Sequence, residues 1–308
     1  MVAAAALCLG CTTDPSTPAG PDEWSGRVTA VRALVRQGVA DGVPGVVVVM
    51  ADRDRHAAVS QGLARLSPRV PVTATVPFRI ASLTKPMTAT VVMRLVESGR
   101  LALDDTVEAL APGLLREGER ITVEQLLSHW AAMPEVPEPL VAAGRVVPDA
   151  VTARGLSREG LDGDPGSLPV YRNSGYLVLS LLVERVTGRA FADVLEDEVL
   201  GPAGMATARL DQHLDEDDVV AHGYYEGEDL THLTIRRAPA AGAVVAAATD
   251  VDRFAAALFA GELVRPATLR RMTRPHGVPL GDWADYGLGL ARLDLPCGPA
   301  HGHGGRLP

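Results

Sequence analysis

Ser82 and Lys85 are the side chains whose types and spacing best suit catalysis, three positions apart in Ser82-Leu83-Thr84-Lys85. An unassisted serine hydroxyl is a weak nucleophile, but a neighbouring amine that has lost its proton can activate it. Ser82 is a good helix cap, and residues three apart on a helix share a face, so the amine would reach the hydroxyl. The spacing predicts Ser82 as the nucleophile and Lys85 as its base.

Lys85 is also the single lysine of the chain, because 28 of the 29 basic residues are arginine. A lysine amine can be tuned to lose its proton near neutral pH, whereas an arginine cannot. The one lysine thus stands where a base is needed. A serine three places before it can also arise by chance, so the pair alone is suggestive.

Tyr171-Arg172-Asn173 is a second candidate segment, placed between a turn at Pro165-Gly166 and an expected helix from Ser174. A tyrosine in such a loop can shuttle protons, and an asparagine can hold a substrate carbonyl. Taken alone, the segment favours a simpler interpretation, a partly buried tyrosine followed by a helix-capping asparagine.

His303-Gly304-Gly305 is the third candidate, near the end of the sequence. Glycines in a strand let another backbone approach closely, and a strand edge beside a nucleophile can donate an N–H group to an oxyanion. The alternatives are a glycine-rich turn and a metal site made by His301 and His303 on one strand face. No third ligand stands nearby, as zinc would need, so we expect neither a metal nor another cofactor.

Composition limits the possible partners. The 308 residues are 47% hydrophobic and 22% charged, enough for one large domain or two joined lobes. The net charge of -9 and the lack of a basic cluster argue against a nucleic-acid partner. The densest charge run, residues 211–218, is acidic, and we expect it to form a solvated loop.

The first 22 residues are expected to be a leader and tether, with the folded domain at residues 23–308. Leu7-Cys8-Leu9-Gly10-Cys11 is similar to a bacterial lipoprotein cleavage box in which Cys11 would carry the lipid, although basic residues are missing before it. The stretch 12–22 is polar and proline-rich, as in a tether. We therefore expect an extracytoplasmic protein, secreted or held at a membrane through Cys11.

The elements that must position these residues can be read from periodicity. Residues 24–39 predict a helix with Val28, Val31, Leu34 and Val35 on one face, and residues 46–51 and 56–63 predict a strand pair. Residues 82–263 are mainly helical, with helices over 86–98, 122–130, 174–187, 191–200 and from 249. Strands return at 286–293 and 301–306. This pattern predicts an α/β fold with a helical region inserted between the first and last strands of one sheet.

Together, Ser-x-x-Lys, Tyr-x-Asn and His-x-Gly in this order resemble the serine β-lactamase-fold hydrolases, specifically the class C-like group of β-lactamases, D-alanyl-D-alanine carboxypeptidases and esterases. The resemblance runs from about Val28 to Pro308 and includes flanking segments such as Leu126-Leu127-Ser128-His129 and Pro239-Ala240-Ala241-Gly242. It implies an antiparallel sheet flanked by helices plus a mainly helical lobe.

The resemblance also implies a role for each residue. Ser82 would be acylated, Lys85 would be the base, Tyr171 would relay protons and Asn173 would contact the substrate. The backbone amides of Ser82 and Arg306 would form the oxyanion hole, with His303 and Gly305 beside the substrate. The substrate would be a small molecule or peptide, namely an ester, a D-alanyl peptide or a β-lactam.

Four departures from the family pattern bear on these expectations. Arg172 fills a usually small position, Trp130-Ala131-Ala132 replaces Thr-Ser-Gly, and His303 stands where most β-lactamases have lysine. In relatives, two more strands and a C-terminal helix follow the position of Pro308, so we expect these to be missing and the strand at 301–306 to lack a partner on that side.

Three functions remain open from the sequence. The leading one is an acyl-transfer hydrolase of amide or ester bonds, which the esterase-like or peptidase-like His303 favours. The second is a true β-lactamase. The third is a penicillin-binding relative that binds an acyl ligand without turnover, or an inactive truncated relative.

Overall fold

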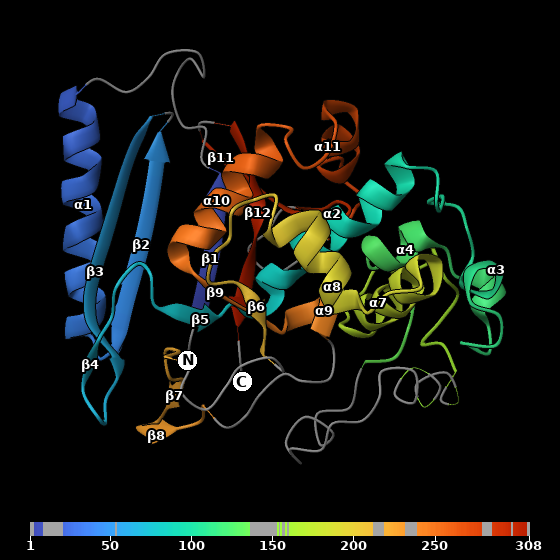
Figure 1. Cartoon of the computed structure of the whole chain (residues 1–308), viewed down its shortest axis with the longest axis horizontal. Helices are drawn as coiled ribbons and strands as arrows, with labels where there is room; N and C mark the ends of the chain where they lie inside the picture. Colours follow the sequence, from blue (N-terminus) through green and yellow to red (C-terminus); the bar gives the residue numbers. More distant parts are fainter. Residues whose placement is uncertain are drawn as a thin grey trace.

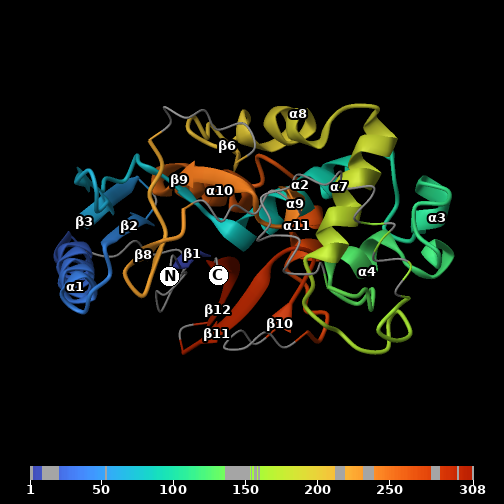
Figure 2. The ribbon, with the colours of Figure 1, turned by 90° about the horizontal axis from the view of Figure 1, so that it is seen from below.

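Strands of two sheets and a helical lobe lie side by side in this α/β protein (Figure 1). The computed structural model describes residues 3–8, 21–52, 54–135, 153, 155, 158, 160–211, 219–231, 239–278, 285–296 and 298–306. Seen from below, α1 and the first strand pair lie at one end of the molecule, and α3 and α4 lie at the other (Figure 2). The arrangement of strands and helical lobe agrees with the expected α/β fold, but the prediction that the first and last strands form one sheet is wrong, because β2-β3-β4 and β1-β12-β11-β10 are separate hydrogen-bonded sheets.

The N-terminal layer is a helix on a strand pair, as periodicity predicted. Helix α1 (Pro21–Ala40) packs on β2 (Gly45–Asp52) and β3 (Arg55–Arg65), which pair antiparallel, and β4 (Val70–Pro71) extends β3. Val35 is 2% exposed beneath the helix, whereas Leu34 is 71% exposed. The prediction that Leu34 shares the inward face with Val35 is wrong, because the stripe that α1 buries against the strands includes Val35 and leaves Leu34 in solvent.

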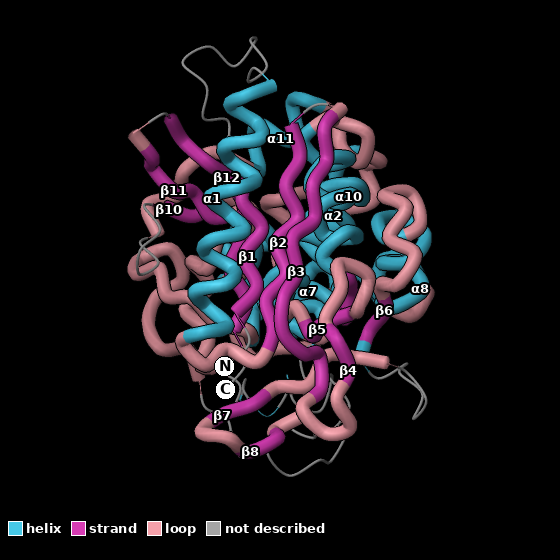
Figure 3. The backbone as a smooth tube through the Cα atoms, turned by 90° about the vertical axis from the view of Figure 1, so that its left-hand side faces the viewer, coloured by secondary structure: helices cyan, strands magenta, loops and turns pink. Residues whose placement is uncertain are grey.

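The second sheet contains the His-x-Gly strand. Its order is β1 (Ala3–Cys8), β12 (Gly298–Arg306), β11 (Ala291–Leu295) and β10 (Asp285–Tyr286), all antiparallel. The register runs from Ala3 opposite Arg306 to Cys8 opposite His301. The expectation that this strand lacks a partner is therefore wrong. Strand β1 lies between β12 and β2 and pairs with β12 through backbone hydrogen bonds (Figure 3).

Part of the expected leader therefore lies in the sheet. Cys11 and the rest of residues 9–20 lie outside the described residues, so the lipid anchor, the tether and export stay predictions. Among the described helices, none is both long and apolar enough to cross a bilayer.

A small third sheet leads directly into the nucleophile segment. Strand β5 (Pro77–Arg79) and β6 (Arg209–Leu210) flank β9 (Val244–Ala247), and the Ile80 amide donates to the Val244 carbonyl at 3.1 Å. Helix α10 (Ala248–Phe259) packs against β1, β2 and β9 and so connects the sheets. The small sheet thus fixes the backbone just before Ser82.

Asp211, at the end of β6, corrects the prediction of a solvated acidic loop. Its side chain is 2% exposed and accepts a hydrogen bond from Arg79 Nε at 3.0 Å. A buried carboxylate needs such a partner, because removing its charge from water is otherwise costly. Residues 212–218 of the predicted loop lie outside the described residues.

The helical lobe forms around two buried helices, α2 (Thr84–Glu97) and α7 (Ser174–Thr187). The other elements of the described chain are α3 (Val107–Leu110), η2 (Gly118–Arg120), α4 (Val123–Leu127), α8 (Phe191–Leu195), the π-helical turn η3 (Glu196–Leu200), α9 (Pro239–Gly242), α11 (Pro266–Met272) and the pair β7 (Tyr224–Tyr225) with β8 (Glu228–Asp229). Thr122 and Gln125 form a capping box at the start of α4.

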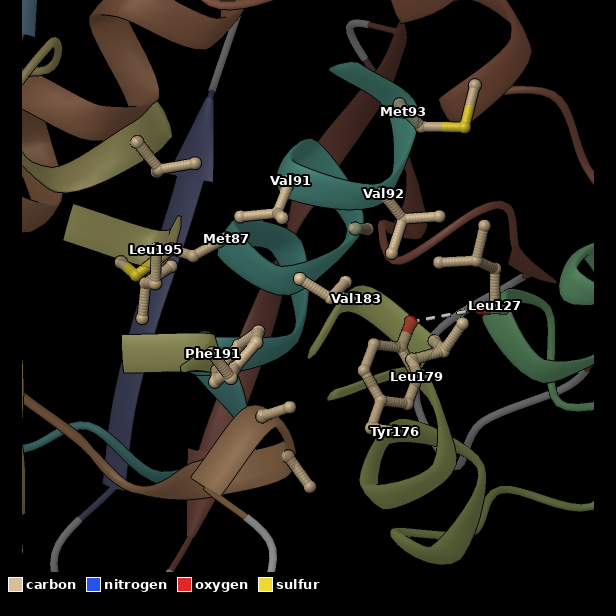
Figure 4. Close-up of a cluster of buried hydrophobic side chains, with 14 of the residues drawn as sticks. Met87, Val91, Val92, Met93, Leu127, Tyr176, Leu179, Val183, Phe191 and Leu195 are labelled. Atoms are coloured by element: carbon tan, nitrogen blue, oxygen red, sulfur yellow. Dashed lines mark hydrogen bonds between the residues drawn. The ribbon is translucent and has the colours of Figure 1, made fainter. Parts of the chain in front are cut away.

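Apolar side chains from α2, α4, α7 and α8 meet in the core of this lobe (Figure 4). Helix α2 is buried almost all round, as expected for a helix without a polar face. Burial of this kind supplies most of the favourable free energy of folding. The core therefore holds α2, the helix that follows Ser82, rigidly against α7, the helix that follows Asn173.

We expect Leu179→Ala to lower the free energy of unfolding by about 2 to 5 kcal/mol, because Leu179 is 1% exposed in this core and its removal leaves a cavity. Leu34→Ala is the matched control, since Leu34 is 71% exposed, and it should change stability by less than about 0.5 kcal/mol. Urea unfolding of the two variants measures both values. Equal losses would contradict this description of the core.

Candidate active site

Ser82 lies in a tight turn rather than at a helix cap. It is the middle residue of the 3-10 turn η1 (Ala81–Leu83), and α2 begins only at Thr84. Ala81 has a φ of 48°, a left-handed conformation that costs free energy for a residue other than glycine. The predicted capping by Ser82 is wrong, because no side-chain cap is formed, and the hydroxyl is directed to other partners.

Lys85 is fully buried in the first turn of α2 and has three polar contacts. Its Nζ lies 3.1 Å from Ser82 Oγ, 2.8 Å from Asn173 Oδ1 and 3.0 Å from the Ala241 carbonyl oxygen. The contact with Ser82 follows from the i, i+3 spacing, whereas those with Asn173 and Ala241 need α7 and α9 to pack against α2. The predicted pair is therefore in contact.

Burial lowers the pKa of the Lys85 amine to about 7, against the opposing effect of the Glu135 charge. At neutral pH a substantial fraction of the amine is then uncharged. A neutral amine has two N–H groups and one lone pair, and Asn173 Oδ1 and the Ala241 carbonyl can each accept one N–H. The lone pair is left for the Ser82 hydroxyl proton, which is the arrangement that a general base requires.

Tyr171 lies on the other side of the nucleophile. Its hydroxyl is hydrogen-bonded to the Ser82 side chain, and burial raises its pKa above the ordinary value. The Lys85 amine lies 4.7 Å from the centre of the Tyr171 ring. Ser82 is therefore in contact with both a lysine and a tyrosine that can move its proton.

His129 holds the Tyr171 segment from both sides. Its carbonyl accepts from the Val170 amide at 3.0 Å, its Nδ1 accepts from the Arg172 amide at 3.3 Å, and its ring lies 4.4 Å from the Tyr171 ring. Burial holds the pKa of His129 well below its usual range, and the nearby Lys85 charge lowers it further, so Nδ1 stays free to accept. The sequence assigned no role to His129, which appeared there only in the flanking segment Leu126-Leu127-Ser128-His129.

Asn173 is turned toward the site instead of capping its helix. It occupies the N-cap position of α7, but its side chain makes no capping bond. Its Oδ1 accepts from Lys85, and its backbone amide donates to both carboxylate oxygens of Glu135, at 3.1 and 3.0 Å. Both ends of the side-chain amide thus face other groups of the site, and the contact with substrate that the family resemblance implied stays a prediction. Glu135 was missed, because a lone glutamate after Met133-Pro134 has no distinctive pattern.

The end of β12 lies against the nucleophile turn. A Cβ atom on Gly305 would come within 2.2 Å of the Ile80 carbonyl oxygen and 2.9 Å of Leu83 Cδ1, so only glycine allows this approach. Gly305 is therefore where it was expected, next to Ser82. Arg306 follows as the last residue of β12, with an exposed side chain.

His303 is buried beside this cluster and is uncharged. Burial and the nearby Lys85 charge lower its pKa to about 3. Its Nδ1 must carry the proton, because it donates to the Gly304 carbonyl, and Nε2 therefore accepts from the Tyr286 hydroxyl at 3.0 Å. With both ring nitrogens engaged, His303 is a poor metal ligand. Among the described residues, no group of three metal-binding side chains is found.

Two departures from the family pattern are held away from Ser82. Arg172 Nη2 pairs with Asp162 at 3.0 Å, and the Trp130 indole donates to the His276 carbonyl at 2.9 Å. The structure therefore brings Ser82, Lys85, Tyr171, Asn173, His303 and Gly305 together. Cys11 lies outside the described residues.

Comparison with known proteins identifies the family to which the chain belongs. A model of the Beta-lactamase family matches residues 31–307. Penicillin-binding protein 4 of Amycolatopsis lactamdurans is 29% identical over 296 residues, which cover 85% of this chain and 74% of the relative. D-aminopeptidase of Brucella anthropi is 28% identical over 277 residues, or 86% of this chain and 52% of the relative. The chain thus spans about half the length of D-aminopeptidase and of several other curated relatives.

Solved structures give the same answer for the fold. The D-stereospecific amidohydrolase from Streptomyces sp. matches with a TM-score of 0.79 and 26% identity, over 91% of this chain and 87% of that one. The family model and the fold agree over nearly the whole sequence. This chain therefore belongs to the Beta-lactamase family, the serine hydrolases of the β-lactamase fold.

Proposed function

We propose that this protein is a serine hydrolase that cleaves amide bonds through an acyl-enzyme on Ser82. The observation that carries the proposal is the buried Lys85 amine, 3.1 Å from Ser82 Oγ and with its pKa lowered to about 7. A lysine in this state can accept a proton at neutral pH, which an ordinary surface lysine does too rarely to serve as a base.

In the first step, Ser82 Oγ attacks the substrate carbonyl carbon as its proton passes to Lys85 Nζ. The carbonyl oxygen becomes an oxyanion, for which the backbone amides of Ser82 and Arg306 are the proposed donors. The close approach of Gly305 to Ile80 supports this assignment, since it brings the end of β12 to the turn that carries Ser82.

In the second step, the intermediate collapses, the carbon–nitrogen bond breaks, and the leaving amine takes a proton. Tyr171 suits this relay, because its hydroxyl is hydrogen-bonded to Ser82 and its raised pKa keeps the proton on it until it is transferred. Water then attacks the acyl-enzyme while the same groups remove the water proton and return one to Ser82. The products are the amine released in acylation and the carboxylic acid released in deacylation, and Ser82 is regenerated.

The substrate that we propose is an amide of a D-amino acid. The relatives named D-aminopeptidase and D-stereospecific amidohydrolase support an amide substrate with D-stereochemistry. The uncharged His303 supports it as well, because a neutral imidazole offers no positive charge to the carboxylate that β-lactams carry. Esters remain a second substrate class, since the same attack cleaves them.

A β-lactamase and a non-hydrolysing penicillin-binding protein remain the alternatives. Relatives named as penicillin-binding proteins support acylation by a β-lactam. The two alternatives differ from the proposal in the fate of the acyl group: a β-lactamase releases it rapidly, whereas a binding protein retains it.

Ser82 should be the single site of covalent labelling. Exposure to a penicillin and to a fluorophosphonate should give one adduct each, at Ser82, by mass spectrometry of the intact protein and of its peptides. Ser82→Ala should give no adduct, whereas the control Ser98→Ala, at the C-terminal end of α2, should label normally. An adduct on any other residue, or one that persists in Ser82→Ala, refutes the assignment.

Lys85→Arg should lower kcat/KM by about 10² to 10⁴ while the fold is kept, because arginine retains the charge but cannot accept the Ser82 proton. In the wild type, kcat/KM should rise with pH through about 7, since Lys85 acts only when it has lost its proton. Hydrolysis rates across pH measure both effects, with the exposed-site change Arg36→Lys as control. An arginine variant within a few-fold of wild type would exclude Lys85 as the base.

D-alanine p-nitroanilide and short-chain esters should be turned over faster than the cephalosporin nitrocefin, because the buried His303 supplies no positive charge to a substrate carboxylate. L-alanine p-nitroanilide serves as the stereochemical control. Initial rates of the four compounds settle the order. A clear preference for nitrocefin would instead favour the β-lactamase alternative.

A further inference from the structure

Glu135 is the carboxylate that acts on the Lys85 amine, and sequence reasoning gave it no role. It lies eight residues after the end of α4, and its side chain is half-buried. Both carboxylate oxygens accept the Asn173 backbone amide, at 3.1 and 3.0 Å, and Oε2 also lies 3.4 Å from Asn173 Nδ2. It therefore contacts the backbone and the side chain of Asn173 at once.

These contacts decide which way the Asn173 amide points. An ionised carboxylate can only accept hydrogen bonds, so the NH₂ end of the asparagine must face Glu135. The Oδ1 end then faces Lys85 Nζ at 2.8 Å. The opposite orientation would place an amide oxygen against a carboxylate and an NH₂ group against the lysine, so it is unfavourable at both ends.

The charge of Glu135 also acts at this point of the fold. The Asn173 backbone amide is one of the N–H groups at the start of α7 that have no acceptor within the helix. A carboxylate is favourable there, because the N-terminus of a helix carries a partial positive charge. The titratable groups that surround Lys85 are Glu135, Tyr171, Tyr176, His129 and His303. The pKa values of both histidines are lowered and those of both tyrosines are raised, so these four groups are uncharged near neutral pH.

We propose that Glu135 is a positioning residue of this site: its carboxylate orients Asn173 so that the amide oxygen holds Lys85 toward Ser82. The consequence of this positioning for catalysis rests on the proposed function. The orientation of Asn173 and the effect of the Glu135 charge on Lys85 do not. Because Glu135 is the charged neighbour of Lys85 among these groups, it opposes the effect of burial and keeps the amine easier to protonate.

The single lysine allows a direct test that needs no substrate. Protein grown with 13C-labelled lysine should give one ε-carbon signal, and its shift across pH reports the titration of Lys85 alone. In Glu135→Gln we expect the midpoint to fall by about one pH unit, because an opposite charge nearby is removed. Glu119→Gln, at an exposed position of η2, is the matched control and should leave the midpoint unchanged. An unchanged midpoint in Glu135→Gln overturns the charge effect.

Positioning through Asn173 is tested by a double-mutant cycle on the rate of penicillin acylation. Glu135→Gln should slow acylation about tenfold in the wild-type background, which corresponds to a typical interaction energy between two contacting residues. In the Asn173→Ala background the same change should have almost no effect on the acylation rate. Equal losses in both backgrounds overturn the positioning role. If Glu135→Gln does not fold, Glu135→Asp replaces it: the charge is retained and the reach is shorter, so acylation should slow with little change in the midpoint.

The two proposals can fail separately. A wild-type protein that is never acylated at Ser82 refutes the proposed function, but the lysine titration still decides whether Glu135 acts on Lys85. A wild-type protein that is acylated normally, with Glu135→Gln identical to it in both measurements, refutes the role of Glu135 alone.

Discussion

The buried amine of Lys85 is the feature on which the arrangement of this site depends. An ammonium or amine removed from water needs hydrogen-bond partners, because an unpaired polar group in the interior costs free energy. Here its hydrogen-bond partners are Ser82, Asn173 and Ala241, which come from the turn before α2, the start of α7 and helix α9. Three segments that are distant in sequence must therefore pack together before the lysine is satisfied.

Helix α2 is held to α9 and to the first residue of β9 by further hydrogen bonds. Thr88 donates to the Ala240 carbonyl at 2.7 Å, and Thr84 accepts from the Val244 amide at 3.1 Å. The buried threonines of α2 thus act as connectors to the segment that supplies an acceptor to Lys85. The same rigidity preserves the lowered pKa of the amine, because a looser site would admit water and reduce the effect of burial.

A cluster of neutral aromatic rings completes the surroundings of the amine. His129, Tyr171, Tyr176, Tyr286 and His303 lie in contact, with ring centres between 4.4 and 6.2 Å apart. Tyr286 donates to His303, and Tyr176 donates to the Leu127 carbonyl at 3.0 Å (Figure 4). These bonds satisfy polar atoms of Tyr176, Tyr286 and His303 without adding charge. Glu135 is thereby left as the carboxylate that acts on Lys85.

Spacing and periodicity within single segments were enough to predict the contact between Ser82 and Lys85, the helices α1, α2, α7 and α10 and the strand pair β2–β3, because these features depend on local sequence. The order of Tyr171, Asn173 and His303 added the family and hence the fold. The sequence could not reveal Glu135, the bracketing of Tyr171 by His129, the neutral state of His303 or the pairing of β1 with β12. Each of these depends on contacts between distant segments and on the exclusion of water, which exist only once the tertiary structure has formed.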